Sequence, residues 1–213
     1  MDEVILKSIK DALAKGDRAG VSKLTKEALD KGIEVKTILE DGLIASMNII
    51  GEKFKANEIF IPEVLIAAKA MHAGIAVLEP YFSACGIKPA GKVIIGTVKG
   101  DLHDIGKNIV SMMLKGARFE IVDLGIDVPP GKFVEIVQAK GADIIAMSSL
   151  LTTSMGAMKD TIKLLKDAGV RDKVKIIVGG APVTQNFADS IGADGYAKDA
   201  ATAVDKAKEL LKV

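Results

Sequence analysis

Short apolar runs rich in valine and isoleucine alternate with helical patterns through the second half of the chain. Clear runs lie at residues 93–98, 119–122, 144–147 and 174–178, and a weaker one surrounds residues 195–197. Strands that alternate with helices are joined by right-handed crossovers, so they assemble into a parallel sheet with helices on both faces. Five such units predict a doubly wound α/β domain with the flavodoxin-like (Rossmann-type) strand order 2-1-3-4-5.

The first part of the chain has helical periodicity only. Apolar spacing predicts helices over about residues 2–14, 21–31, 35–50 and 62–80, with Pro62 in a first turn and Pro80 as a stop. None of these helices can bury its apolar face alone, which favours an antiparallel four-helix bundle. Residues 83–91 are small and lack periodicity. We expect a helical domain at 1–85, a linker at 86–91 and the α/β domain at 92–213.

Composition excludes several classes of protein. Lysine and arginine number 29 against 28 acidic residues, so no net field attracts nucleic acid or anionic lipid. The single cysteine, Cys85, cannot form an intramolecular disulfide, and the start of the chain is charged where a signal peptide would be apolar. No apolar run approaches the roughly 20 residues that cross a bilayer. We expect a soluble cytoplasmic protein without nucleic-acid or membrane partners.

The loop after the first predicted strand carries the residues that most invite a chemical explanation. In open parallel sheets such loops bind ligands, and this one contains Asp101 and His103. A phosphate-binding P-loop is excluded, because five residues separate Gly100 from Gly106 and Asn108 replaces the required hydroxyl. Asp101 can accept a hydrogen bond from one ring nitrogen of His103 and leave the other for a metal or a proton. A solvent-facing Asp and His in a mobile loop explains this triplet equally well.

The predicted strand order brings further polar residues to the same edge. The loops after the first and third strands adjoin at the topological switch point, so Ser148 should lie near His103. The fourth strand ends in Gly179 and Gly180, whose missing side chains would let a flat ligand approach backbone. Each feature has a plainer explanation, because Ser148 and Thr152 can cap a helix and paired glycines often make a turn.

Three ordered elements resemble one known family. The stretch from Asp101 through His103 and Asp104 to Gly106 matches the Asp-x-His-x-x-Gly motif of cobalamin-binding proteins that replace the cofactor's benzimidazole with a protein histidine. The elements that follow resemble the family's Ser-x-Leu-x-Thr and paired-glycine elements: Ser148, Leu150, Thr152, and Gly179 with Gly180. Residues before 86 resemble the family's helical cap. The chain thus resembles corrinoid proteins of methyltransferase systems, which include those for methanol, methylamines and O-demethylation, and the equivalent modules of methionine synthase.

The resemblance implies a cobalamin bound base-off, with His103 on the cobalt. Ser154 matches a serine that is hydrogen-bonded to the equivalent aspartate in methionine synthase, which implies a relay from Ser154 through Asp101 to His103. The displaced tail would run between sheet and helices, near the hydroxyls of Ser148 and Thr152. Room for the tail would come from three glycines: Gly96, Gly179 and Gly180.

The same resemblance assigns a cover to the opposite face of the corrin. Phe54 and Ile61 match the two large apolar residues of the methionine synthase cap that shield this face. They would share a face in a continuous helix, but Pro62 follows closely, so a turn can intervene. Ordinary bundle core is the alternative for both residues.

The implied function is that of a methyl carrier rather than a self-sufficient enzyme, because nothing in the sequence provides a domain for a methyl donor. The cobalt would accept a methyl group as Co(I) from a substrate-specific methyltransferase. It would deliver the group from methyl-Co(III) to a second methyltransferase that uses tetrahydrofolate or coenzyme M, and a reductive activation protein would restore lost Co(I). The donor stays open among methanol, methylamines, betaines and aryl methyl ethers.

Three other functions are weighed against this one. A cobalamin-dependent regulator would need a basic DNA-binding module, and such photosensors often place a tryptophan above the corrin, which this chain lacks. The cobalamin subunit of a mutase shares the histidine loop but ordinarily has no four-helix cap. A flavodoxin-like or response-regulator domain would need a flavin-stacking aromatic residue or an acidic cluster, and neither is evident.

Overall fold

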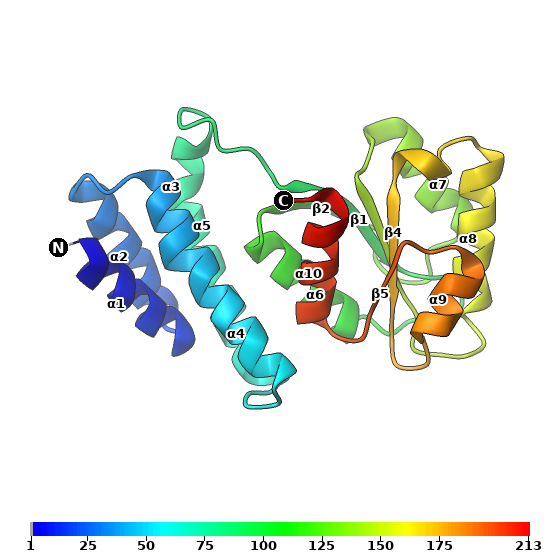
Figure 1. The fold of residues 1–213 in the computed structure, drawn as a ribbon, viewed down its shortest axis with the longest axis horizontal. Coiled ribbons are helices and arrows are strands. Elements are labelled where there is room, and N and C mark those ends of the chain that lie inside the picture. The colour runs from blue at the N-terminus through cyan, green and yellow to red at the C-terminus, as the bar shows by residue number, and fades with distance from the viewer. Residues whose placement is uncertain (1) are drawn as a thin grey trace. The chain divides into compact units, whose positions relative to one another are not determined.

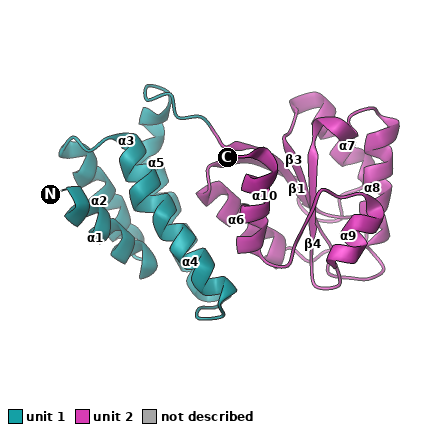
Figure 2. Ribbon diagram, viewed as in Figure 1, with its two compact units in different colours: residues 1–88 teal, residues 89–213 magenta. Residues whose placement is uncertain are grey.

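Residues 2–213 are described by a computed structural model in which the chain forms two compact units. The first ends at Lys88 and the second runs from Pro89 to Val213 (Figure 2). The border between them falls inside the stretch 86–91 that the sequence suggested as a linker.

The first unit is a helical bundle (Figure 1). Its helices are α1 (Asp2–Ala14), α2 (Arg18–Asp30), α3 (Val35–Thr37), a π-helical stretch (Ile38–Ile44), α4 (Ala45–Lys55) and α5 (Ile61–Phe82). Because α3, the π-helical stretch and α4 follow one another without a break, they make one long helix, so the predicted count of four helices is correct. The apolar stripe that the sequence predicted is buried, with Ile9, Leu13, Leu39, Met71 and Leu78 at 0% exposure.

Two details of α5 correct the expectations from sequence. The helix continues to Phe82 and contains Pro80. Its last fully buried residue, Leu78, precedes the proline, so Pro80 interrupts only a final turn that follows an already packed helix. With 22 residues and a mean hydropathy of 1.5 in its most apolar window, α5 is also long and apolar enough to cross a membrane, contrary to what the sequence suggested. A buried core helix has the same properties, and α5 packs against α1, α2 and α4 within the bundle.

The second unit is the predicted doubly wound sheet. Its strands are β1 (Gly91–Thr97), β2 (Phe119–Asp123), β3 (Ile144–Ser148), β4 (Lys175–Gly179) and β5 (Gly195–Ala197), all parallel, in the order β2-β1-β3-β4-β5. One face carries α6 (Ile105–Gly116) and α10 (Ala200–Leu211) (Figure 1). The other carries α7 (Pro130–Lys140), α8 (Gly156–Asp167) and α9 (Gln185–Ile191), and a short 3-10 turn (Arg171–Lys173) precedes β4.

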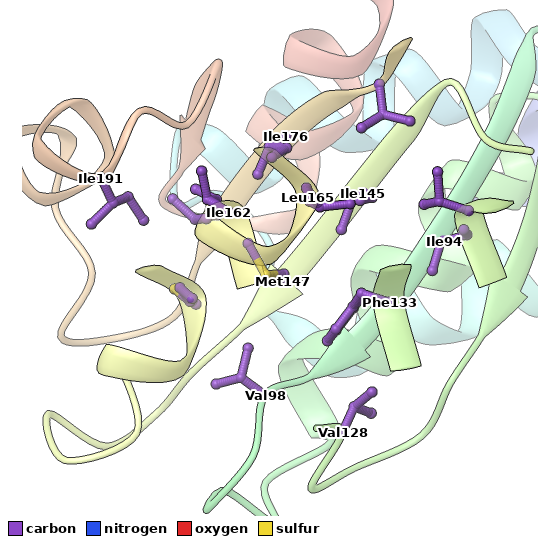
Figure 3. Packing of buried hydrophobic residues seen from close by; sticks show 14 of the residues in the cluster. Ile94, Val98, Val128, Phe133, Ile145, Met147, Ile162, Leu165, Ile176 and Ile191 are labelled. Carbon is purple, nitrogen blue, oxygen red and sulfur yellow. The ribbon is translucent and has the colours of Figure 1, made fainter. Parts of the chain in front are cut away.

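The core under α7 and α8 supports the carboxyl ends of the central strands. Phe133 of α7 is fully buried and lies close to Ile94 of β1, and Ile162 and Leu165 of α8 belong to the same cluster (Figure 3). The register sets Thr97 beside Ser148 and Ser148 beside Gly179. The loops that follow β1, β3 and β4 therefore leave the sheet at one level, and well-packed strands fix where each begins.

Candidate functional site

The loop between β1 and α6 is folded tightly by its own hydrogen bonds. Thr97 Oγ1 donates to the carbonyl of His103 at 2.8 Å, and the backbone N–H of Asp101 donates to the carbonyl of Val98 at 3.2 Å. Gly100 has a φ of +83°, a conformation that favours glycine at this turn. The loop thus holds Asp101 and His103 in fixed places.

Asp101 is the most highly bonded side chain of the site. Its Oδ1 accepts from His103 twice, from the backbone N–H at 3.0 Å and from Nδ1 at 2.7 Å. Its Oδ2 accepts from the backbone N–H of Leu150 at 2.5 Å and from Ser154 Oγ at 3.2 Å. The structure therefore contains the contacts that the resemblance implied, in which Ser154 and His103 both donate hydrogen bonds to Asp101.

These bonds decide the charge of Asp101, whose side chain is fully buried. Burial raises the pKa of the carboxyl group. Donation from the backbone of His103 and Leu150, and from the side chains of His103 and Ser154, lowers it more, so the pKa of Asp101 falls from 3.8 to about 2. The group is a carboxylate at neutral pH, and a carboxylate only accepts, so Nδ1 of His103 carries the shared proton.

The bond to Asp101 leaves one ring nitrogen of His103 available. Because Nδ1 is bonded to Asp101, Nε2 is the nitrogen with a free lone pair, and the side chain is 53% exposed. A carboxylate on the far nitrogen fixes the tautomer and raises the basicity of a metal-binding histidine. Asp104 is the residue before α6 and accepts from Asn108 at 2.9 Å, while a Cβ placed on Gly106 would meet open space. The space next to Gly106, three residues after His103, is thus open.

The residues after β3 divide into buried and exposed positions. Ser148 is half-buried at the strand end, whereas Leu150 and Thr152 are exposed, and Ser154 is buried at 4% exposure. Helix α8 begins at Gly156, and no side chain caps its N-terminus. Helix capping therefore does not explain Ser148 and Thr152, which leaves their hydroxyls available.

The glycines act differently from the expectation that they leave room for a cofactor tail. A Cβ on Gly180, where φ is +126°, would lie 1.8 Å from the carbonyl oxygen of Ser149. On Gly179 it would lie 2.8 Å from the carbonyl of Ala197, and on Gly96 it would lie 3.0 Å from the ring of Phe133. The space beside each glycine is therefore filled by the protein's own groups. Close packing within the chain accounts for these three glycines, and a contact with a ligand is not needed to explain them.

Three residues that sequence reasoning missed also support the loop. Thr97 is described above, and Ser149 lies at 0% exposure with its Oγ 2.7 Å from Ser154 Oγ. Asp127, in the loop after β2, accepts from the backbone N–H of Gly100 at 2.7 Å and donates its own N–H to the carbonyl of Asp101 at 3.0 Å. Its φ of +52° is tolerated best by Gly, Asn and Asp, but the angle is visible only in the structure.

The two residues expected above a cofactor lie in the helical unit. Phe54 is half-buried near the end of α4, and Ile61 begins α5 with 42% exposure, so a turn separates them. They are therefore not on one continuous helix. Ile61 is not a buried residue of the bundle core, because 42% of it is exposed.

The surroundings of His103 suit a large, apolar metal complex better than a bare ion. Within residues 2–213, no group of three or more His, Cys, Asp or Glu side chains could hold a metal ion. A corrin ring supplies its own equatorial nitrogens and needs only one axial ligand from the protein. Large apolar side chains are exposed in the loops after β1, β2 and β3 and at the first residue of α6: Leu102, Ile126, Leu150, Leu151 and Ile105. Exposed apolar surface of this kind marks a binding site.

Comparisons with known proteins point the same way. Residues 91–205 match a family described as a B12 binding domain, and residues 5–79 match a second family with that description. Dimethylamine corrinoid protein 2 of Methanosarcina acetivorans is 46% identical over 98% of this chain and 97% of its own length. The trimethylamine corrinoid protein of Methanosarcina barkeri is 46% identical over 100% of this chain and 98% of its own length. A chain in the crystal structure of the methanol:cobalamin methyltransferase complex from Methanosarcina barkeri is 30% identical, with a TM-score of 0.85 over 98% of this chain and 80% of that one.

Proposed function

The chain belongs to the corrinoid proteins that contain B12 binding domains, and from this membership we propose that it carries methyl groups between methyltransferases. The observation that supports the proposal best is His103, whose Nδ1 is hydrogen-bonded to a buried carboxylate while about half of its side chain is exposed, which leaves Nε2 available. A bound corrinoid supplies a cobalt centre that can take up a methyl group and release it.

The roles of the chain's own residues follow from the geometry. His103 would bind the cobalt of a corrinoid held base-off and His-on, and Asp101 would orient the His103 ring. Ser154 would donate a hydrogen bond to Asp101, as the distance of 3.2 Å between Ser154 Oγ and Asp101 Oδ2 allows. Ser148 and Thr152 would offer hydroxyls to the displaced tail, and the exposed apolar side chains of Leu102 and Leu150 would lie against the corrin.

The methyl donor is proposed to be a methylated amine. Relatives named as dimethylamine and trimethylamine corrinoid proteins are 46% identical to this chain, compared with 30% for the chain from the methanol complex. One partner would be the methyltransferase for that amine, as the solved methanol complex illustrates for a relative. The further partners would be a second methyltransferase, which uses tetrahydrofolate or coenzyme M, and a reductive activation protein. The balanced charge and the lone cysteine favour a cytoplasmic location.

Phe54 and Ile61 are proposed to shield the methyl group from water and light. Both are large apolar residues near the turn between α4 and α5, and Ile61 is exposed. The stretch 86–91 would then act as the hinge that lets partner enzymes reach the methyl group.

Electron paramagnetic resonance of the Co(II) form tests the central assignment. We expect hyperfine splitting from one axial nitrogen, and this splitting should change when the protein is labelled with ¹⁵N-histidine. The chain has only two histidines, so His72→Gln serves as a matched control that keeps the splitting, whereas His103→Ala should lose it. Nitrogen splitting that histidine labelling does not alter would show that the cofactor keeps its own base.

A further inference from the structure

Two buried serines in the loop between β3 and α8 share a small set of hydrogen-bond acceptors. Ser149 Oγ lies 2.7 Å from Ser154 Oγ, and each hydroxyl lies 3.0 Å from the carbonyl oxygen of Leu151. Ser154 Oγ also lies 3.2 Å from Asp101 Oδ2. Both serines are buried, at 0% and 4% exposure, so the hydroxyls depend on one another and on these acceptors.

These contacts outnumber the protons available for them. A serine hydroxyl has one proton to donate and can accept up to two hydrogen bonds. The two serines therefore have two protons for four oxygen–oxygen contacts. The contact between the hydroxyls is the shortest and has the ordinary length of an O–H···O bond, so one of the protons lies in it.

The direction of that bond decides what Asp101 receives. If Ser154 donated to Ser149, its only proton would be used, and its oxygen would face the buried carboxylate without a hydrogen between them. If Ser149 donates to Ser154, the Ser154 proton is free for Asp101. Hydrogen bonds to ionised acceptors are roughly twice as strong as neutral ones, and an unpaired buried acceptor is costly. The second direction is therefore favoured, and the Leu151 carbonyl still has the backbone N–H of Ser154 at 3.2 Å.

We propose that Ser149 is a positioning residue that donates to Ser154 and so directs the Ser154 hydroxyl proton to Asp101. Without Ser149, Ser154 Oγ loses the hydrogen bond that it accepts. Neighbouring hydrogen bonds polarise and strengthen one another, so the Ser154 hydroxyl is then a weaker and less firmly oriented donor to Asp101 Oδ2. The carboxylate that holds His103 would be less well supported on this oxygen.

The paired glycines give Ser149 its place. The backbone N–H of Ser149 donates to the carbonyl of Gly179 at 3.1 Å. Its own carbonyl lies against Gly180, where any side chain would collide with it. Both backbone groups of Ser149 are thus fixed by the end of β4, which is why its hydroxyl can serve as a fixed donor.

The effect of Ser149 on a bound corrinoid rests on the proposed function, because Asp101 would act on the metal only through His103. The hydrogen bonds themselves belong to the chain without a cofactor, and they are tested there. Failure of the serine proposal and failure of the histidine–cobalt proposal therefore show in different experiments.

Nuclear magnetic resonance of the full chain without corrinoid provides the test. The amide proton of Leu150 is the reporter, because it donates to the same Asp101 Oδ2 as Ser154. When that oxygen loses the Ser154 donor it should bind the Leu150 proton more strongly, which moves the resonance downfield. We expect a downfield shift in Ser149→Ala and in Ser154→Ala. Residue 149 directly precedes Leu150, so its substitution also shifts the amide proton by a local effect, which the difference between the double variant and Ser154→Ala measures. The shift between Ser149→Ala and wild type should be larger than this local effect, because Ser149 acts through Ser154.

Two further variants keep the test decisive. Thr153→Ala removes an exposed hydroxyl from the same loop and should leave the Leu150 resonance in place. Ser149→Cys nearly preserves the volume but is a weak donor, so it should shift the resonance as Ser149→Ala does, and it replaces that variant if the alanine chain does not fold. An unshifted Leu150 resonance in Ser149→Cys, or shifts that add in the double variant, would overturn the proposal.

Discussion

At the scale of single residues, the site depends on one carboxylate with four donors. Asp101 has a pKa of about 2, below the ordinary 3.8, so the folded state favours the ionised form. Its stabilising contribution is fully present above the ordinary pKa and is lost as the pH falls through the folded value.

Asp101→Asn should therefore lower the free energy of unfolding of the cofactor-free chain by about 2 kcal/mol at neutral pH. The difference from wild type should shrink as the pH falls from about 4 toward 2, because wild-type Asp101 then takes up its proton. Urea unfolding followed by circular dichroism at several pH values measures this. Asp104→Asn, in the same loop but exposed, should change stability by less than about 0.5 kcal/mol at every pH. If the difference in free energy of unfolding between Asp101→Asn and wild type does not depend on pH, the charge of Asp101 is not its source.

Sequence reasoning reached Asp101, His103 and Ser154 because they stand at motif spacing. It could not reach Ser149 or Asp127, whose roles depend on contacts between residues far apart in the chain: Ser149 with Gly180, and Asp127 with Gly100 and Asp101. No local period encodes such contacts. The glycines were expected to leave room for a cofactor, and the structure shows in addition that the neighbour that excludes a side chain is the protein itself.

At the scale of elements, the strands were predicted within one or two residues because their apolar runs are buried on both sides of the sheet. The π-helical stretch Ile38–Ile44 was not predicted, because a single extra residue in a helical turn leaves the surrounding periodicity almost unchanged. A substitution of Gly180, directly after β4, tests whether the end of this strand fixes the loop that follows β3.

Gly180→Ala should destabilise the chain by roughly 2 kcal/mol or more, because a side chain at a φ of +126° is strained and its Cβ would collide with Ser149. Gly131→Ala is the matched control. Gly131 lies in the first turns of α7 with open space beside it, so alanine there should be neutral or stabilise by up to about 1 kcal/mol. Urea midpoints of both variants against wild type measure the difference, and equal midpoints would contradict the assigned packing role of Gly180.

At the scale of the whole molecule, the division into a helical unit and an α/β unit followed from the change in periodicity near residue 85. The function did not follow from periodicity. It required the ordered motifs and the family that shares them, because many unrelated activities use a doubly wound sheet.

Phe54→Ala tests the proposed cover over the methyl group. We expect the methylated, corrinoid-loaded chain to lose its methyl group faster under light, because a large apolar side chain would no longer shield the bond. The histidine splitting of the Co(II) form should persist, since His103 would bind the other side of the metal. Ile49→Ala, which truncates an exposed apolar residue of the same helix, is the control and should photolyse at the wild-type rate. Equal photolysis rates for Phe54→Ala and wild type would remove Phe54 from the cover.

The exposed apolar side chains around His103 also affect the protein before any cofactor arrives. Leu102, Ile126, Leu150 and Leu151 lie in loops that follow the strands, Ile105 begins α6, and the chain's formal net charge is only +1. Copies of such a chain would repel one another weakly, so these exposed apolar side chains could drive association. A corrinoid bound at His103 would cover them. On the proposed function, cofactor insertion would then raise solubility as well as activate the carrier, and carriers without a corrinoid would be both idle and prone to aggregation.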